Sequence, residues 1–184
     1  MKKTLIIIGI LAIVLAVGFV FWRNQVKSLS PESGVDFNEG DVQIHVFYNR
    51  PYKKGRVIFA ENGLVPFGKV WRTGANEATY IKTNKTLLIK GQELKPGKYS
   101  IWTIPDAQSW KVIFNSDYPS WGINFNGEAN RQPKADVITV EVPVGQTENE
   151  IEQFTISIEK NDEEMELVFL WDKTVVAVPF TVSK

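Results

Sequence analysis

Two patterns of hydrophobic positions divide this chain. The first is continuous, because residues 5–22 read LIIIGILAIVLAVGFVFW without a charged residue. A helix rises about 1.5 Å per residue, so this segment would cover roughly 27 Å of a hydrocarbon core about 30 Å thick. We therefore expect a membrane-spanning helix, with residues 1–27 forming an N-terminal membrane anchor.

A cleavable signal peptide is the alternative interpretation of this segment, because Lys2 and Lys3 would form a suitable basic start. The apolar run is longer than is usual for such a peptide, and no A-x-A cleavage site follows it, so an uncleaved signal anchor is favoured. Trp22 suits the membrane interface. The free amine with Lys2 and Lys3, against Arg23 and Lys27, favours an inside N-terminus and a single-pass protein whose C-terminal domain lies outside the cytoplasm, as in a periplasmic location.

The second pattern, with a period of two, begins after residues 28–40. That short segment, SLSPESGVDFNEG, is rich in Ser, Gly and acidic residues, and we expect it to be a linker. The run DVQIHVFYN (41–49) then alternates apolar and polar positions, as a half-buried strand does. Similar runs follow at 77–83, 85–89, 98–104, 110–115, 136–142, 154–159, 164–171 and 174–182.

The connections between these runs have the composition of turns. Residues 95–98 read KPGK, in which Pro96 presets the backbone and Gly97 would take a positive φ, and the stretches KNDEE and WDKT have the length of hairpin connections. After the anchor, no window sustains a helical period. Residues 41–184 are therefore expected to form an all-β domain, an antiparallel two-sheet sandwich that is jelly-roll-like.

Composition excludes several classes of function. The chain has 21 basic and 21 acidic residues, and four of the basic ones flank the apolar segment, so the remainder is mildly acidic and unlike a nucleic-acid-binding surface. The absence of cysteine removes disulfides, thiolate metal sites and cysteine nucleophiles. Neither glycine-rich phosphate-binding motif occurs. With His45 as the single histidine, a multi-histidine metal site is impossible, and we expect no metal and no cofactor.

Catalytic chemistry has few candidate residues. A Ser-His-Asp triad would have to use His45, and no G-x-S-x-G elbow accompanies it, so an ordinary half-exposed strand residue is the preferred interpretation. The string RTGANE brings Arg72 and Glu77 close enough in sequence to pair across a turn. Such a pair would keep Glu77 ionised, but it would equally fix the turn, with Asn76 tolerating left-handed geometry.

Tryptophan is the other notable feature. Trp102, Trp110 and Trp171 fall within strand runs and are expected in the core. Trp121 differs, because it lies in SDYPSWGINFNGE, an aromatic and amide-rich stretch of the long region 115–135 that is least strand-like. A loop of this kind suits a glycan or peptide, whereas a core plug is the structural alternative.

Four strings carry a family resemblance: YNRPYKKGRVIF (48–59), GLVPFGKVWRTGANEAT (63–79), LKPGKYSIWTIP (94–105), and WKVIFN followed by Trp121-Gly122. Over residues 41–180 the chain resembles the bacterial domain-of-unknown-function family 2911. The resemblance implies an envelope-associated β domain of the Bacteroidetes type and no particular activity. The signature residues are Tyr48, Arg50, Pro51, Gly55, Arg56, Gly63, Pro66, Gly68, Trp71, Arg72, Gly74, Asn76 and Glu77.

Three functions follow as hypotheses. A binding module for a small envelope ligand, a glycan or a peptide, leads. An envelope scaffold that binds another protein is the second, and a carboxylate-dependent hydrolase using Glu77 with Asp106 or Asp117 is the third, so that an enzyme is the less favoured class. The candidate ligand-binding residues are Arg50, Arg56, Arg72, Asn76, Glu77 and Trp121.

Overall fold

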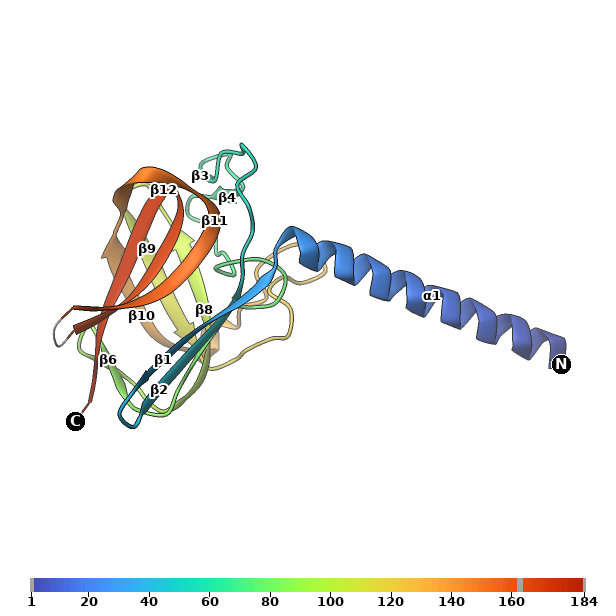
Figure 1. Cartoon of the computed structure of the whole chain (residues 1–184), viewed down its shortest axis with the longest axis horizontal. Helices are drawn as coiled ribbons and strands as arrows, with labels where there is room; N and C mark the ends of the chain where they lie inside the picture. The colour runs from blue at the N-terminus through green and yellow to red at the C-terminus, as the bar shows by residue number, and fades with distance from the viewer. Residues whose placement is uncertain (1, 162–163, 184) are drawn as a thin grey trace.

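A long helix projects from a β-sandwich in the computed structural model, which describes residues 2–161 and 164–183 (Figure 1). The helix, α1 (Lys2–Leu29), ends before Pro31, which cannot donate a helical hydrogen bond. Its part Ile7–Leu29 is long and apolar enough to cross a membrane, and no residue of its apolar window is buried, although Val26 and Lys27 near the domain are half-buried. These properties suggest a single-pass membrane anchor, and a signal sequence near the N-terminus meets the same criteria of minimum length and hydropathy.

Two antiparallel sheets form the domain, as the alternating pattern predicted. The larger sheet has the order β1 (Glu32–Glu39), β2 (Val42–Asn49), β5 (Tyr80–Thr83), β8 (Gly97–Pro105), β9 (Ser109–Asn115) and β10 (Asp136–Pro143). The smaller has the order β11 (Gly145–Asn161), β12 (Glu164–Val182), β6 (Leu87–Ile89) and β7 (Gln92–Leu94). A short parallel pair, β3 (Phe59–Ala60) and β4 (Val65–Pro66), and the 3-10 helix η1 (Pro133–Ala135) complete the described elements.

The main core lies between the two sheets and is rich in aromatic rings. Trp71 and Trp171 stack with ring centroids 5.9 Å apart, and Phe154 and Trp110 contact Trp71 nearly edge-on. Such pairs stabilise a core beyond the area that they bury. The expectation that Trp110 and Trp171 are core residues is confirmed, since each is only 1% exposed.

A second, smaller core covers the outer face of the larger sheet. Trp102 is fully buried there with Ala78 and Ile113. Successive side chains on β8 point to opposite faces, so Ile101 belongs to the main core and Trp102 to this outer one. The outer cluster exists because the loop that ends at Ala78 and the β9–β10 loop fold back over the sheet. These two loops build the candidate site.

The expectation of a linker at residues 28–40 is wrong. β1 pairs with β2 along its whole length, from Glu32 opposite Asn49 to Glu39 opposite Val42. Val35 and Phe37 pack against the main core, while the alternate positions face outward. An edge strand with only two apolar positions shows little alternation of apolar and polar residues. The polar composition of this segment therefore wrongly indicated a linker. Helix and sandwich are therefore joined almost directly.

Two turn predictions also need correction. The stretch WDKT is not a hairpin, because β12 continues through it as one strand, with Asp172 at a φ of 56° beside a shift of register. This geometry bends the strand without ending it. The KPGK turn joins the two sheets, and the positive φ belongs instead to Lys90 and Gly91, in the hairpin between β6 and β7. The turn predicted at KNDEE falls between β11 and β12, and residues 162–163 lie outside the described residues.

Candidate functional site

The string RTGANE forms a loop whose backbone is held in an unusual conformation. Thr73 and Asn76 both have a φ of 54°, and Gly74 has a φ of 148°. Trp71 Nε1 donates to Gly74 O at 3.0 Å, and Thr79 Oγ1 donates to Thr73 O at 2.6 Å. A Cβ at Gly74 would lie 2.9 Å from Asn49 O, so this position requires glycine. The predicted left-handed geometry of Asn76 is confirmed.

Glu77 uses this loop to hold the anchor helix. Its carboxylate pairs with Lys27 Nζ at 2.9 Å and accepts a hydrogen bond from Asn49 Nδ2 at 3.1 Å. Next to it, Asn76 Nδ2 donates to Ser30 O at 3.3 Å. Burial alone would raise the pKa of Glu77, but the hydrogen bonds that it accepts, above all from Lys27, hold that pKa below its usual value. In the described part of the chain, the ion-pair partner of Glu77 is Lys27 rather than Arg72.

Arg72 lies on the other side of the loop, under Gly122 of the β9–β10 loop. A Cβ at Gly122 would come within 2.3 Å of Arg72 Cδ, so the glycine lets the two loops touch. Gly122 N donates to Asn76 O at 2.9 Å, and Asn130 N donates to Gly122 O at 3.1 Å. Arg72 Nε is buried and has no hydrogen-bond partner among the described residues. Burial lowers the pKa of the Arg72 guanidinium, because desolvation penalises its charge.

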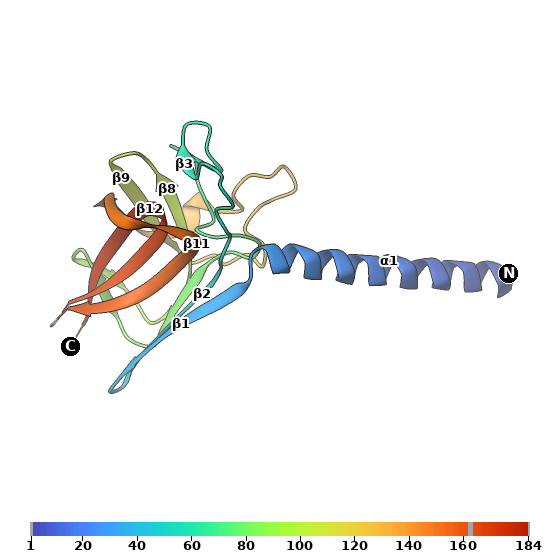
Figure 2. The ribbon, with the colours of Figure 1, turned by 45° about the horizontal axis from the view of Figure 1, so that its top comes forward.

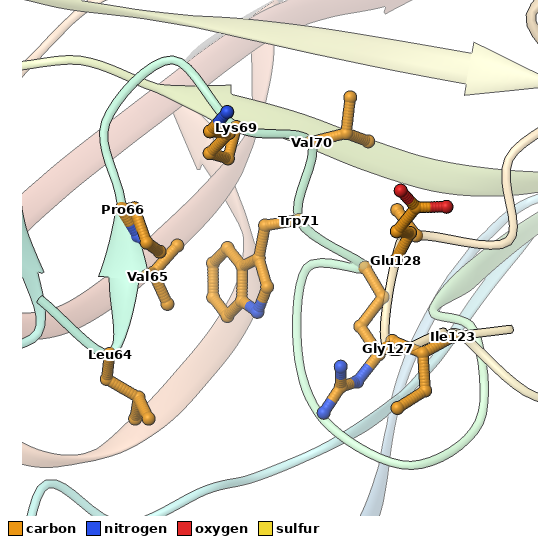
Figure 3. A pocket seen from close by; sticks show the side chains of 11 residues that line it. Leu64, Val65, Pro66, Lys69, Val70, Trp71, Ile123, Gly127 and Glu128 are labelled. Carbon is orange, nitrogen blue, oxygen red and sulfur yellow. The ribbon is translucent and has the colours of Figure 1, made fainter. Parts of the chain in front are cut away.

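A cleft opens beside Arg72. It consists of two adjoining cavities of about 530 and 350 Å³, which share the lining residues Leu64, Val65, Trp71 and Arg72. Figure 3 shows Trp71 between the side that carries Leu64, Val65 and Pro66 and the side that carries Ile123, Gly127 and Glu128.

The charges of this cleft are mostly positive. The larger cavity is lined by Lys69 and Arg72 with one acid, Glu128, which binds Asn124 Nδ2 at 3.2 Å. The smaller is lined by Lys54, Arg56 and Arg72, and none of its described lining residues is acidic. The cleft can therefore receive an anionic group together with an apolar body.

The predicted site residues separate into two groups. The structure brings Arg56, Arg72 and Asn76 together around the smaller cavity. Arg50 does not join them, because its guanidinium donates to Phe154 O at 3.0 Å and to Thr155 Oγ1 at 2.7 Å, which fixes the start of the β2–β3 loop to β11. Glu77 and Trp121 line a different cavity, which lies against α1.

The candidate catalytic residues do not lie in an arrangement that supports catalysis. Asp106, in the β8–β9 turn, accepts a hydrogen bond from Ala107 N, and neither it nor Asp117 lines a described cavity. His45 Nδ1 lies 2.7 Å from Asp36 Oδ1, and the cavity beside this pair has no hydroxyl or thiol side chain among its described lining residues. Within residues 2–161 and 164–183, no group of three His, Cys, Asp or Glu side chains is placed to hold a metal.

Comparison with protein families fits this arrangement. The family described as "Protein of unknown function (DUF2911)" matches residues 30–180, which is most of the chain. The chain belongs to this family. The DUF2911 match begins at Ser30 and so includes β1, whereas the residues of the resemblance began at position 41. No curated protein and no solved structure matches the chain.

Several residues that build the cleft of this DUF2911 domain were missed from the sequence. Gly122 was noted only as part of the SDYPSWGINFNGE loop and of a Trp-Gly pair, and its contact with Arg72 joins positions fifty residues apart. Lys69, Ile123 and Glu128 line the cleft from both loops. The glycines and Asn124 of the β9–β10 loop were the available signal, because they indicate a structured loop and not a flexible one.

Proposed function

We propose that this protein is a membrane-anchored binding module outside the cytoplasm, and that its cleft holds a small glycan or peptide through an anionic group bound by Arg72. The buried Nε of Arg72, without a partner in the described chain, carries the proposal. The location outside the cytoplasm rests on the basic residues before the apolar helix, Lys2 and Lys3.

The physical argument begins with the cost of an unpaired donor. A buried N–H without a partner costs about 1–3 kcal/mol, and more when the group is charged. A carboxylate on a ligand in the cleft would bind the guanidinium in the planar fork that arginine prefers, and because Arg72 Nε is buried, a shift of the Arg72 side chain would bring this donor to the ligand. Binding of an anion would thus satisfy a group that the fold leaves unsatisfied.

The walls of the cleft indicate what kind of ligand would carry the anionic group. Leu64, Val65, Trp71 and Ile123 supply an apolar lining, and the larger cavity has a volume of about 530 Å³. Clefts of roughly 300–1,000 Å³ with apolar walls and a few polar groups are typical of small-molecule sites. A sugar ring or a short aliphatic peptide fits this description.

The hydrolase hypothesis receives less support. Hydrolysis of a glycosidic bond usually needs two carboxyl groups about 5–10 Å apart in one cleft. The described lining of the larger cavity contains the single acid Glu128, and Glu77 is engaged by Lys27 at another cavity. Binding is therefore the function that the geometry favours.

Calorimetric titration of the full chain in zwitterionic lipid nanodiscs tests the proposal. The probes are an alanyl tripeptide with a free C-terminal carboxylate and its amide, and a uronic-acid trisaccharide and its methyl ester. We expect one charged probe to bind and its uncharged counterpart to bind far more weakly. Binding of both forms alike, or of neither charged probe, would contradict the proposal.

The matched variants are Arg72→Lys and Lys111→Gln. Arg72→Lys keeps the charge but loses the Nε donor, and a hydrogen bond to a charged group contributes about 1.5–3 kcal/mol, so affinity should fall roughly 10- to 100-fold. Lys111 is exposed on β9 and lines none of the described cavities, so Lys111→Gln should bind normally. An unchanged melting temperature shows that Arg72→Lys remains folded.

A further inference from the structure

The tip of the β9–β10 loop presents an aromatic side chain to solvent. Phe125 is fully exposed, in a domain whose other phenylalanines on strands are largely buried. Its exposure is not the result of an irregular turn. Asn124 Oδ1 accepts from Asn126 N at 2.9 Å and from Glu128 N at 3.0 Å, and Gly127 takes a φ of 79°. The polar residues of this turn are thus used to hold it together, with Phe125 pointing outward.

The same loop lies against the anchor helix. Trp121 and Phe125 line a cavity of about 430 Å³, and the opposite wall of that cavity is formed by Phe19, Trp22 and Arg23 of α1. Figures 1 and 2 show this loop, drawn in pale orange, beside the end of the helix where it enters the domain. Aromatic side chains from two distant parts of the sequence therefore gather at one level along the helix.

The apolar segment of α1 determines where these aromatic side chains lie relative to the membrane. Phe19 and Trp22 belong to its last turn, and Arg23 is the first charged residue after it. A helix turn rises about 5.4 Å, so these rings lie within roughly that distance of the end of the segment, where the hydrocarbon core gives way to the headgroups. Tryptophan and other aromatic rings are favoured at this interface, because they have an apolar body and tolerate partial hydration.

We infer that the β9–β10 loop is a second membrane contact, in which Phe125 and Trp121 enter the interfacial layer of the bilayer beside α1. The partner is the lipid surface itself, because the loop continues the aromatic end of the spanning helix. This contact would fix the rotation of the domain about the helix and hold the cleft at a constant height above the membrane. It does not depend on what the cleft binds.

A single-cysteine experiment tests this inference, and it is clean because the natural chain has no cysteine. Phe125→Cys in the full chain is labelled with an environment-sensitive NBD fluorophore and reconstituted in phosphatidylcholine vesicles. The control is Asn38→Cys, an exposed position near the far end of β1, which runs away from the helix (Figure 2). Both positions are exposed, so neither substitution should prevent folding.

We expect the emission of the probe at position 125 to be blue-shifted relative to that of the probe at position 38. Lipids that carry a nitroxide near the headgroup should quench the probe at position 125 several-fold more strongly than the probe at position 38, and aqueous iodide should quench it more weakly. Equal exposure of the two probes to iodide would overturn the inference. Protection at position 125 that disappears when the protein is diluted with excess lipid would also overturn it, because the partner would then be a second copy of the chain.

Discussion

The contact between Gly122 and Arg72 yields the sharpest prediction about the cleft. Gly122 is buried, and its φ is not in the left-handed region, so Gly122→Ala tests space rather than backbone conformation. The added Cβ would lie 2.3 Å from Arg72 Cδ and 2.8 Å from Arg72 Cβ. The second atom cannot move without the backbone, so the side chain alone cannot relieve the overlap.

The magnitude follows from overpacking. Inserting a methyl group into a well-packed site costs about 1–3 kcal/mol. For a chain of this size, each kcal/mol lowers the melting temperature by about 2–4 °C, so we expect a fall of roughly 2–12 °C. Thermal unfolding of the full chain in detergent, followed by near-ultraviolet circular dichroism, measures it. The neighbouring exposed Ser120→Ala is the matched control and should change stability by less than about 0.5 kcal/mol.

A double-mutant cycle identifies the cause of this loss. Arg72→Ala removes the Cγ and Cδ atoms that the new methyl group would meet, so Gly122→Ala should cost less in that background than in the natural chain. Strictly additive losses would show that the Cγ and Cδ contacts are not responsible, because alanine at position 72 retains the Cβ that lies 2.8 Å from the new methyl group. An unchanged melting temperature for Gly122→Ala alone would refute the packing of the two loops.

Three further predictions concern the RTGANE loop and the carboxylates. Gly74→Ala should unfold the domain at least several degrees earlier in a thermal scan, because its Cβ would meet Asn49 O at 2.9 Å and its φ is 148°; unaltered melting would argue against the loop geometry. Glu77→Gln should lower stability by about 1 kcal/mol, because it removes the ion pair with Lys27, and the same loss should vanish in a Lys27→Met background. The pKa values of Glu77 and Asp136 are both depressed in the folded chain, because hydrogen bonds outweigh the opposing effect of burial, so their contribution is present above the ordinary carboxylate pKa of about 4 and lost as the pH falls further. Melting temperatures measured from pH 7 to pH 3 should therefore decline below about pH 4, and a rise there would contradict the sign.

The sequence predicted the sandwich because each strand buries one face. Alternation at residues 41–49, with Ile44 and Val46 facing the core, needs no long-range information. β1 was missed because its sequence shows little alternation: only Val35 and Phe37 pack against the core. Its pairing with β2, which lies outside any short sequence window, is what makes it a strand. Local pattern therefore identifies strands with a strong apolar face and fails for polar edge strands.

The backbone conformation of the candidate site could be predicted from the sequence, but its side-chain contacts could not. Gly74 and Asn76 indicated a left-handed turn from their types alone. The partner of Glu77 depended on where α1 meets the domain, and Lys27 lies fifty residues earlier in the chain. Trp121 was assigned to a ligand surface from composition, but its position beside Trp22 is a property of the folded chain. Tertiary placement, which no short window contains, decided each of these cases.

The resonance of the Arg72 Nε–H group provides the most direct test of the proposed binding function. In ¹⁵N-labelled full chain in nanodiscs, the signal is assigned by its loss in Arg72→Lys. The Nε–H groups of Arg50 and Arg131 serve as internal references, because they already donate to Phe154 O and Asp136 Oδ1. On addition of the carboxylate tripeptide or the uronic-acid trisaccharide, the Arg72 signal should shift with saturation while the references stay in place, and the uncharged probes should have no effect. An Arg72 signal that does not move with either charged probe, or that moves equally with the uncharged ones, would contradict the assignment of this cleft as an anion-binding site.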